Sequence, residues 1–146
     1  MEATLDDVKR IAEEHPTLTA YDYFPTKEVP RFYKAAPFEE RRKDLFTEKF
    51  LEQVKVCQFF IQEQAVQTKG FNLERVPFNF KHDVEAWERI RGNRTYITEG
   101  AFIIAALLEG VKGEHRNIYP PDADSQYIQF CLKLKVLDHE KLRNPN

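Results

Sequence analysis

The sequence predicts a mainly α-helical fold, a compact bundle of about five helices with an extended proline and aromatic strap. Three observations support this fold class. Apolar residues recur at helical spacing in several stretches, capping residues and glycines stand where those stretches should begin and end, and a hydrophobic fraction of 42% suits a packed core. At 146 residues the chain has the length of one domain, so we expect residues 1–146 to fold as a single helical unit.

The first helix is expected directly after Thr4. Thr4 and Asp7 have the spacing of a capping box, and Pro16 ends the pattern. The apolar residues between them share one helical face: Leu5, Val8, Ile11 and Ala12. This pattern predicts a short amphipathic helix.

The strap follows, from residue 16 to residue 37. It contains four prolines and no glycine, and aromatic residues are interleaved with the prolines. Because proline removes a backbone donor and restricts the residue before it, we expect an extended segment with no regular secondary structure.

The main helix is expected from Pro37 to Thr68, with Gly70 at the position of its C-terminal cap. A stripe of residues at steps of three and four would bury one side of it: Phe46, Phe50, Val54, Cys57, Ile61, Ala65 and Thr68. Phe59 and Phe60 widen the stripe. A helix of about 30 residues is long, so a break within residues 39–50 is the alternative.

The segment 71–83 alternates apolar and polar residues around Pro77, which predicts a loop or an edge-strand fragment. A short helix is then expected from Asp83 to Arg91, ended by Gly92. Thr98 has the chemistry of an N-cap for a strongly apolar helix over residues 100–108, which Gly110 closes.

The segment 125–137 fits two templates, since its apolar residues alternate as in a strand and also fit one helical face. Pro120, Pro121 and Asp122 precede it with helix-starting chemistry, and no clear strand partner is evident elsewhere. We favour a helix here.

Sequence motifs for catalysis and cofactor binding are absent. The only serine is Ser125, and the five glycines do not have the spacing of phosphate-binding loops. Cys57 and Cys131 form no CxxC pair and both fall in apolar patterns, so we expect reduced core thiols. His82 and Glu85 could share a helix face, and we interpret them as solvated charges. We therefore assign no catalytic residue, no metal ligand and no cofactor.

Charge and hydropathy restrict the partners and the location. The formal net charge is −2, so no global field attracts a polyanion or an acidic membrane surface. The N-terminal residues do not resemble a secretory signal, and no apolar run has the length of a membrane span. We expect a cytoplasmic protein with no membrane partner.

The residues around Gly92 raise the hypothesis of a nucleic-acid contact. Three arginines and two rings surround this turn: Trp87, Arg89, Arg91, Arg94 and Tyr96. The following helix is too apolar to read base edges, and Glu85 and Glu88 precede the arginines at helical spacing. Solvated or ion-paired arginines at a structural turn are the favoured interpretation, and nucleic-acid binding is the alternative function.

The strap supplies the leading functional hypothesis. Some of its aromatic residues exceed what one small core holds, and their exposed remainder would form a contact surface: Phe24, Phe32, Tyr33 and Phe38. We therefore expect a macromolecule-binding protein whose partner is another protein or a second copy of this chain. The third hypothesis is an enzyme or small-ligand binder of unknown chemistry.

Overall fold

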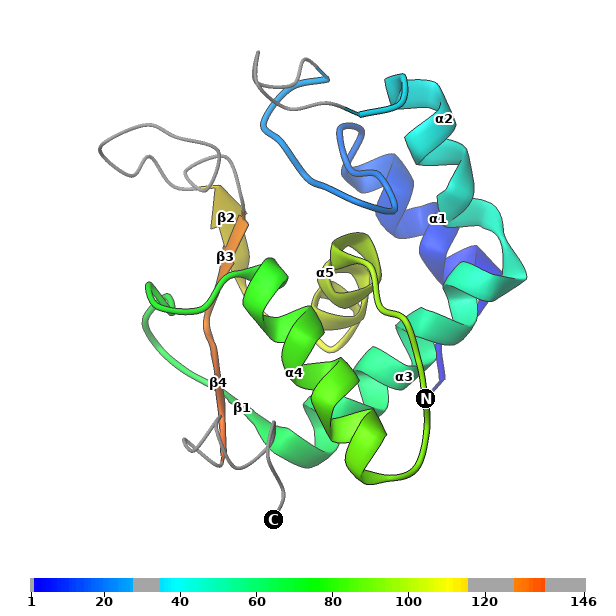
Figure 1. Cartoon of the computed structure of the whole chain (residues 1–146). Coiled ribbons are helices and arrows are strands. Elements are labelled where there is room, and N and C mark those ends of the chain that lie inside the picture. Colours follow the sequence, from blue (N-terminus) through cyan, green and yellow to red (C-terminus); the bar gives the residue numbers. More distant parts are fainter. Residues whose placement is uncertain (1, 28–34, 116–127, 136–146) are drawn as a thin grey trace.

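The computed structural model describes residues 2–27, 35–115 and 128–135. It is mainly helical, as the sequence predicts, with small two-stranded sheets at one side (Figure 1). The described helices are α1 (Leu5–Glu14), α2 (Phe38–Lys43), the 3-10 turn η1 (Asp44–Phe46), α3 (Glu48–Gln64), α4 (Pro77–Ile90) and α5 (Glu99–Leu108). The strands are β1 (Ala65–Gln67), β2 (Gly113–His115), β3 (Ile128–Phe130) and β4 (Leu132–Leu134).

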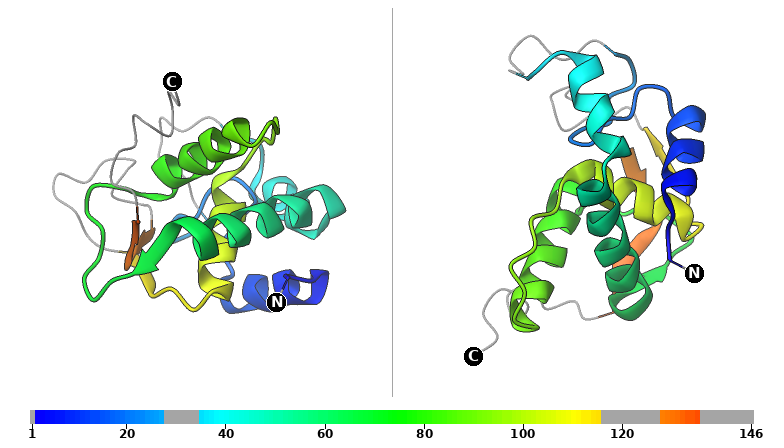
Figure 2. Two further views of the ribbon diagram at one scale, coloured as in Figure 1. Left: turned by 90° about the horizontal axis from the view of Figure 1, so that it is seen from below. Right: turned by 90° about the vertical axis from the view of Figure 1, so that its right-hand side faces the viewer.

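The apolar helix α5 forms the centre of the core. Every residue from 101 to 106 is fully buried, and α5 contacts α1, α3 and α4. Figure 2 shows α5 between α1 and α4 with α3 beside it. Thr98 caps the helix as predicted, because its side chain accepts a hydrogen bond from the Ala101 amide. Gly100 lies against the carbonyl groups of Thr19 and Ala20, where a Cβ atom would clash.

The helix α1 begins and ends with defined hydrogen bonds. The predicted capping box of Thr4 and Asp7 is present. At the other end, Arg42 donates to the carbonyl oxygens of Ala12 at 2.6 Å, Leu18 at 2.7 Å and His15 at 3.3 Å. The guanidinium group thus adds donors at and just beyond the helix C-terminus, where the Ala12 and His15 carbonyls also accept backbone hydrogen bonds.

The expected single helix from residue 37 to residue 68 is divided. The break falls within residues 39–50, where the alternative placed it, because Thr47 is extended and its side chain accepts from the Phe50 amide at 3.2 Å. The helix α3 ends at Gln64, where Ala65 turns into β1, so the prediction of a helix to Thr68 with Gly70 as its cap is wrong. The predicted stripe is buried from Phe50 to Ala65.

The prediction of a loop over residues 71–83 is also wrong from Pro77 onward. The helix α4 begins at Pro77, six residues before the expected start at Asp83. Proline is tolerated there because the first helical residue needs no backbone donor. The Asn79 side chain accepts from the Val76 amide at 3.0 Å, and Arg75 forms an ion pair with buried Asp83 at 2.6 Å. Gly92 follows with φ 86°, which confirms the predicted end.

The described part of the segment 125–137 forms two strands, so the preference for a helix is wrong. β3 pairs antiparallel with β2, and β4 pairs antiparallel with β1. Both partner strands have only three residues, too few for a recognisable alternation in the sequence. Ile128, Phe130, Leu132 and Leu134 point their side chains into the core.

The described part of the strap has no helix, and one bridge joins Leu18 to Tyr23. The buried carboxylate of Asp22 anchors it to α2 through an ion pair with Arg41 at 3.0 Å. Arg41 also donates to the Ala36 carbonyl. Two expected contact residues of the strap, Phe32 and Tyr33, lie outside the described residues.

Candidate binding surface

The turn between α4 and α5 holds one of its arginines firmly. The Arg91 guanidinium lies over the Trp87 ring at 4.4 Å and over the Phe59 ring at 4.8 Å. It also approaches the Glu88 carboxylate at 3.7 Å, which confirms ion pairing at this position. Asn93 donates to the same carboxylate at 2.7 Å. Arg91 and the buried Trp87 therefore belong to the architecture of the turn.

Arg89 and Arg94 differ from Arg91. Both are exposed, and no carboxylate in the described part of the chain forms an ion pair with either. Of the two forms of the favoured interpretation, solvated or ion-paired, the structure shows the solvated one for these two arginines. Glu85 is already engaged, since it accepts from the Ile97 amide at 3.1 Å and contacts His82 at 2.9 Å. The two guanidinium groups face solvent with their donors available.

Tyr96 is the exposed ring of this turn. It is 62% exposed, and the Lys81 ammonium lies 5.6 Å from the centre of its ring. The same ammonium lies 5.6 Å from the ring of Phe78, which is 47% exposed. An exposed ring beside cations is the arrangement that stacks on nucleic-acid bases or on planar protein groups.

Three neighbouring cavities lie along this face, and we call them the cavity row. The first, of about 500 Å³, is lined by Tyr21, Ala35, Ala36, Glu40, Arg41, Lys43 and Asp44. The second, of about 260 Å³, is lined by Ala20, Tyr21, Asp44, Thr47, Lys49, Phe50, Gln53, Tyr96 and Thr98. The third, of about 460 Å³, is lined by Glu85, Arg89, Arg94, Thr95 and Tyr96.

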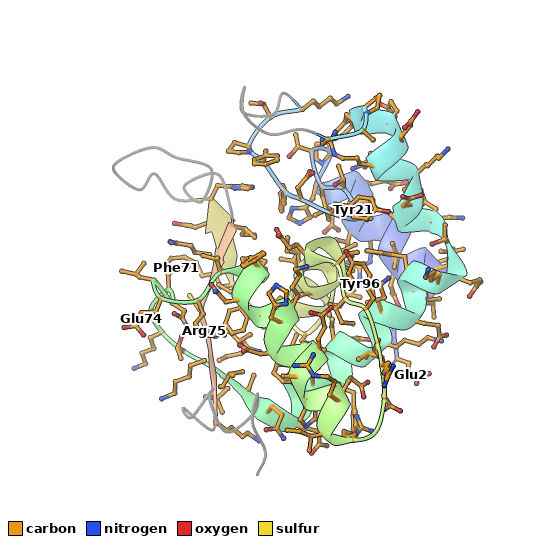
Figure 3. All side chains as sticks on the ribbon, in the orientation of Figure 1. Glu2, Tyr21, Phe71, Glu74, Arg75 and Tyr96 are labelled. Atoms are coloured by element: carbon orange, nitrogen blue, oxygen red, sulfur yellow. The ribbon has the colours of Figure 1, made fainter. Side chains whose placement is uncertain are left out.

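Neighbouring cavities of the row share lining residues. Tyr21 and Asp44 line both the first and the second cavity, and Tyr96 lines both the second and the third. Figure 3 shows Tyr21 and Tyr96 near each other in this view, on the strap and on the connection before α5. Residues from the strap, α2, η1, α3 and the α4–α5 connection thus meet along one path.

The acidic groups of the row are mostly engaged within the protein. The Tyr21 hydroxyl donates to the Asp44 carboxylate at 2.5 Å. That hydrogen bond, with burial and the charge of Asp44, raises the pKa of Tyr21 to about 12, so its hydroxyl stays protonated at neutral pH. By contrast, no ion pair in the described residues holds Lys43 or Lys49. The row presents free cations and rings to a ligand.

The expected strap surface is less open in its described part. Phe24 is buried at 2% exposure, so its ring belongs to the core. Phe38 is partly buried, and the Lys27 ammonium lies 5.2 Å from its ring centre. Phe32 and Tyr33 are not among the described residues, so their part in a contact surface stays a prediction.

Other reactive groups belong to the interior or to local pairs. Cys57 and Cys131 are free and buried, as predicted, and burial raises the pKa of Cys57 well above its usual value. His82 contacts Glu85, and the described residues contain no group of three or more side chains suited to a metal ion. Among those residues no helix combines the length and apolar character that crossing a bilayer requires.

No family model, curated protein or solved structure matches the chain. The interpretation of the candidate surface therefore rests on the geometry of this structure alone. Sequence reasoning singled out Tyr96, Arg89 and Arg94 but not Tyr21 or Lys49, which line the middle of the row. Nothing local marks these two residues, since their role follows from the packing of the strap against η1 and α3.

Proposed function

We propose that the protein binds single-stranded nucleic acid along the cavity row. One observation carries the proposal: three neighbouring cavities share exposed tyrosines as lining residues, and Lys43, Lys49, Arg89 and Arg94 beside them have no ion-pair partner in the described residues. Cations that follow a path attract successive phosphates, and tyrosine rings stack on bases of any identity.

A single strand fits this surface better than a duplex. A recognition helix must present polar side chains to the major groove, and α5, which follows the turn, is buried from residue 101 to residue 106. Stacking on Tyr21 and Tyr96 requires unpaired bases. With a net charge of −2 the attraction is local, so affinity depends on these few side chains.

The experiment is fluorescence anisotropy of labelled single-stranded and duplex oligonucleotides over a series of salt concentrations. We expect about micromolar binding of the single strand at low salt, with log K falling by about 0.7 per phosphate contact for each decade of salt. Tyr21→Ala with Tyr96→Ala should lower affinity at unchanged salt slope. Lys49→Ala should lower the slope.

Lys55→Ala is the matched control, because Lys55 lies on the same helix as Lys49, pairs with Glu52 at 3.3 Å and lines none of the three cavities. Its binding should equal that of the wild-type protein. Absence of binding at low salt, or equal binding by the double tyrosine variant, would overturn the proposal.

A protein partner or a second copy of the chain is the other candidate, favoured by a separate exposed patch. Phe59 on α3 is 40% exposed, and its ring packs on the Trp87 ring of α4 at a centroid distance of 5.4 Å. Ile90, one turn after Trp87 on α4, is 46% exposed. Trp and Arg with exposed apolar neighbours are typical of interface centres. Light scattering should then give a mass above 17.3 kDa that Phe59→Ala reduces to the monomer.

A further inference from the structure

Positive charge is distributed unevenly along the cavity row. The third cavity has two arginines without ion pairs in the described chain, Arg89 and Arg94. The second cavity has one lysine, Lys49. In the first cavity Lys43 lies with the exposed Glu40, and Arg41 is committed to Asp22. The third cavity, which shares no lining residue with the first, is therefore a cationic end of the row.

The groups of the third cavity suit a phosphate with more than one negative charge. A guanidinium group offers a planar fork of donors that matches phosphate oxygens, and two such groups can serve one dianion. Thr95 lines the same cavity, and its hydroxyl is a hydrogen-bond donor. A phosphate monoester carries about −1.5 to −2 charges at neutral pH, against about −1 for the diester inside a strand.

The one carboxylate of this cavity does not oppose an anion freely. Both Glu85 oxygens have partners, His82 Nδ1 at 2.9 Å and the Ile97 amide at 3.1 Å, and its side chain is only 14% exposed. The two arginines are exposed, whereas Glu85 is largely covered and both its oxygens are engaged, so the cations of this cavity are more accessible to a ligand than its carboxylate.

We propose that the third cavity binds the terminal phosphate of a nucleic-acid strand, held by Arg89 and Arg94, while the adjoining base stacks on Tyr96. This inference rests on the proposed function, and it fixes where one end of the strand lies: the phosphorylated end is in the third cavity, and the strand continues past Tyr96 and Tyr21 into the second and first cavities.

The test uses the full chain and three versions of a short fluorescent oligothymidylate, with a 5′-phosphate, a 3′-phosphate or neither. We expect one phosphorylated version to bind about tenfold more tightly than the unmodified strand, the gain of one charge-assisted contact set. The other should bind like the unmodified strand. The identity of the preferred version gives the direction of the strand.

Variants separate this site from the rest of the row. Arg89→Ala with Arg94→Ala should remove the preference while the unmodified strand still binds. Lys49→Ala should weaken all three versions equally and keep the preference. Arg10→Ala, an exposed arginine on α1 away from the three cavities, should change nothing. Far-UV circular dichroism checks that each variant is folded.

The outcomes distinguish the terminal-phosphate site from the binding of a strand along the cavity row. Equal binding of all three versions overturns the terminal-phosphate site and leaves strand binding intact, whereas no binding of any version overturns both. Thymidine 5′-monophosphate and inorganic phosphate serve as competitors. If either one binds as tightly as the phosphorylated strand, the cavity recognises the small anion alone, and the assignment to a strand end is wrong.

Discussion

Two pairs of arginines in this chain differ in their burial and in their contacts. Arg41 is 6% exposed and bonded to buried Asp22, and its neighbour Arg42 donates to three carbonyl oxygens around the end of α1. Arg89 and Arg94 are exposed, and no ion pair holds either of them within the described residues. The first pair completes the fold, and the second pair has its donors open to a ligand.

The difference shows that the structural role of an arginine depends on the groups it contacts in the fold and not on its neighbours in sequence. Glu39 and Glu40 precede Arg41 and Arg42 on α2, as Glu85 and Glu88 precede Arg89 on α4. Yet the partner of Arg41 is Asp22, from the strap, and Glu85 is occupied by a histidine and a backbone amide. Long-range packing thus decides which cations remain available.

The largest expected effect is that of Arg41→Ala. The substitution removes one partner of a buried ion pair, which is strongly destabilising, so we expect the free energy of unfolding to fall by about 3–5 kcal/mol. Urea denaturation followed by circular dichroism measures it. Arg89→Ala is the matched control and should change stability by less than about 0.5 kcal/mol. Equal losses in the two variants would break the comparison.

A double-variant cycle sharpens this result. Asp22→Asn removes the charge that Arg41 neutralises, so adding it to Arg41→Ala should restore part of the lost stability. If the two losses add fully, the ion pair is not the cause. Thr19 also donates to Asp22 at 3.0 Å, so the asparagine keeps a hydrogen-bond partner in the turn.

Local signals in the sequence were sufficient for several elements. The capping box at Thr4, the left-handed glycines Gly92 and Gly110 and the cap at Thr98 each act within a few residues, and all lie where they were predicted. The buried face of α3 also follows from spacing alone. These features depend on interactions between residues three or four positions apart, which a sequence displays directly.

Other elements depend on partners distant in sequence. β1 ends α3 because Ala65 pairs with Leu134, and β3 forms because β2 pairs with it. Three-residue strands carry too short a pattern to predict, so caps and prolines favoured a helix there. The candidate site has the same limit: the sequence singles out the exposed Tyr96, but the first and second cavities adjoin where Tyr21 meets Asp44, two residues distant in sequence.

Arg42→Ala is expected to have the second largest effect. It removes the donor to the Ala12, His15 and Leu18 carbonyls, of which Ala12 and His15 keep a backbone donor. We expect the lost hydrogen bonds to cost about 1–3 kcal/mol in total. Chemical denaturation gives the loss. Arg42→Lys keeps the charge but not the fork of donors, so it should recover only part of it. Full recovery by lysine would show that charge alone matters here.

Arg91→Ala should have a smaller effect, because the contacts of Arg91 within the fold are weaker than those of Arg41 and Arg42 but stronger than those of Arg89 and Arg94. Its contact with the Trp87 and Phe59 rings is worth about 0.5–1 kcal/mol at a partly exposed site. Its ion pair with buried Glu88 is long at 3.7 Å, and Asn93 still donates to that carboxylate in the variant. Trp87 fluorescence reports the local change and thermal unfolding reports the stability. Arg94→Ala should leave both unchanged, and a shift in Trp87 emission in that variant would contradict the assignment of Arg94 to solvent.

The smallest expected effect is a dependence of stability on pH near the end of α1. His15 lies beside the carbonyls that Arg42 closes, and its Nδ1 contacts the Tyr23 hydroxyl at 2.6 Å. Burial lowers the pKa of His15 below its usual 6.5, against a weaker opposing effect of Glu14. The unfolded chain therefore binds the proton more readily than the folded protein.

It follows that the stability due to neutral His15 is fully present above pH 6.5 and is lost as the pH falls below that value toward the lowered pKa of the folded state. Asp7, whose pKa is lowered mainly by the Thr4 backbone hydrogen bond, loses its contribution only near and below pH 3.8, so the two windows are separate. Urea midpoints at mildly acidic and neutral pH, compared between the wild-type protein and His15→Gln, isolate the effect. The wild-type midpoint should fall more on acidification than that of the variant, since glutamine takes up no proton. Parallel pH dependence in the two proteins would show that His15 lies in solvent and that its protonation does not change the stability.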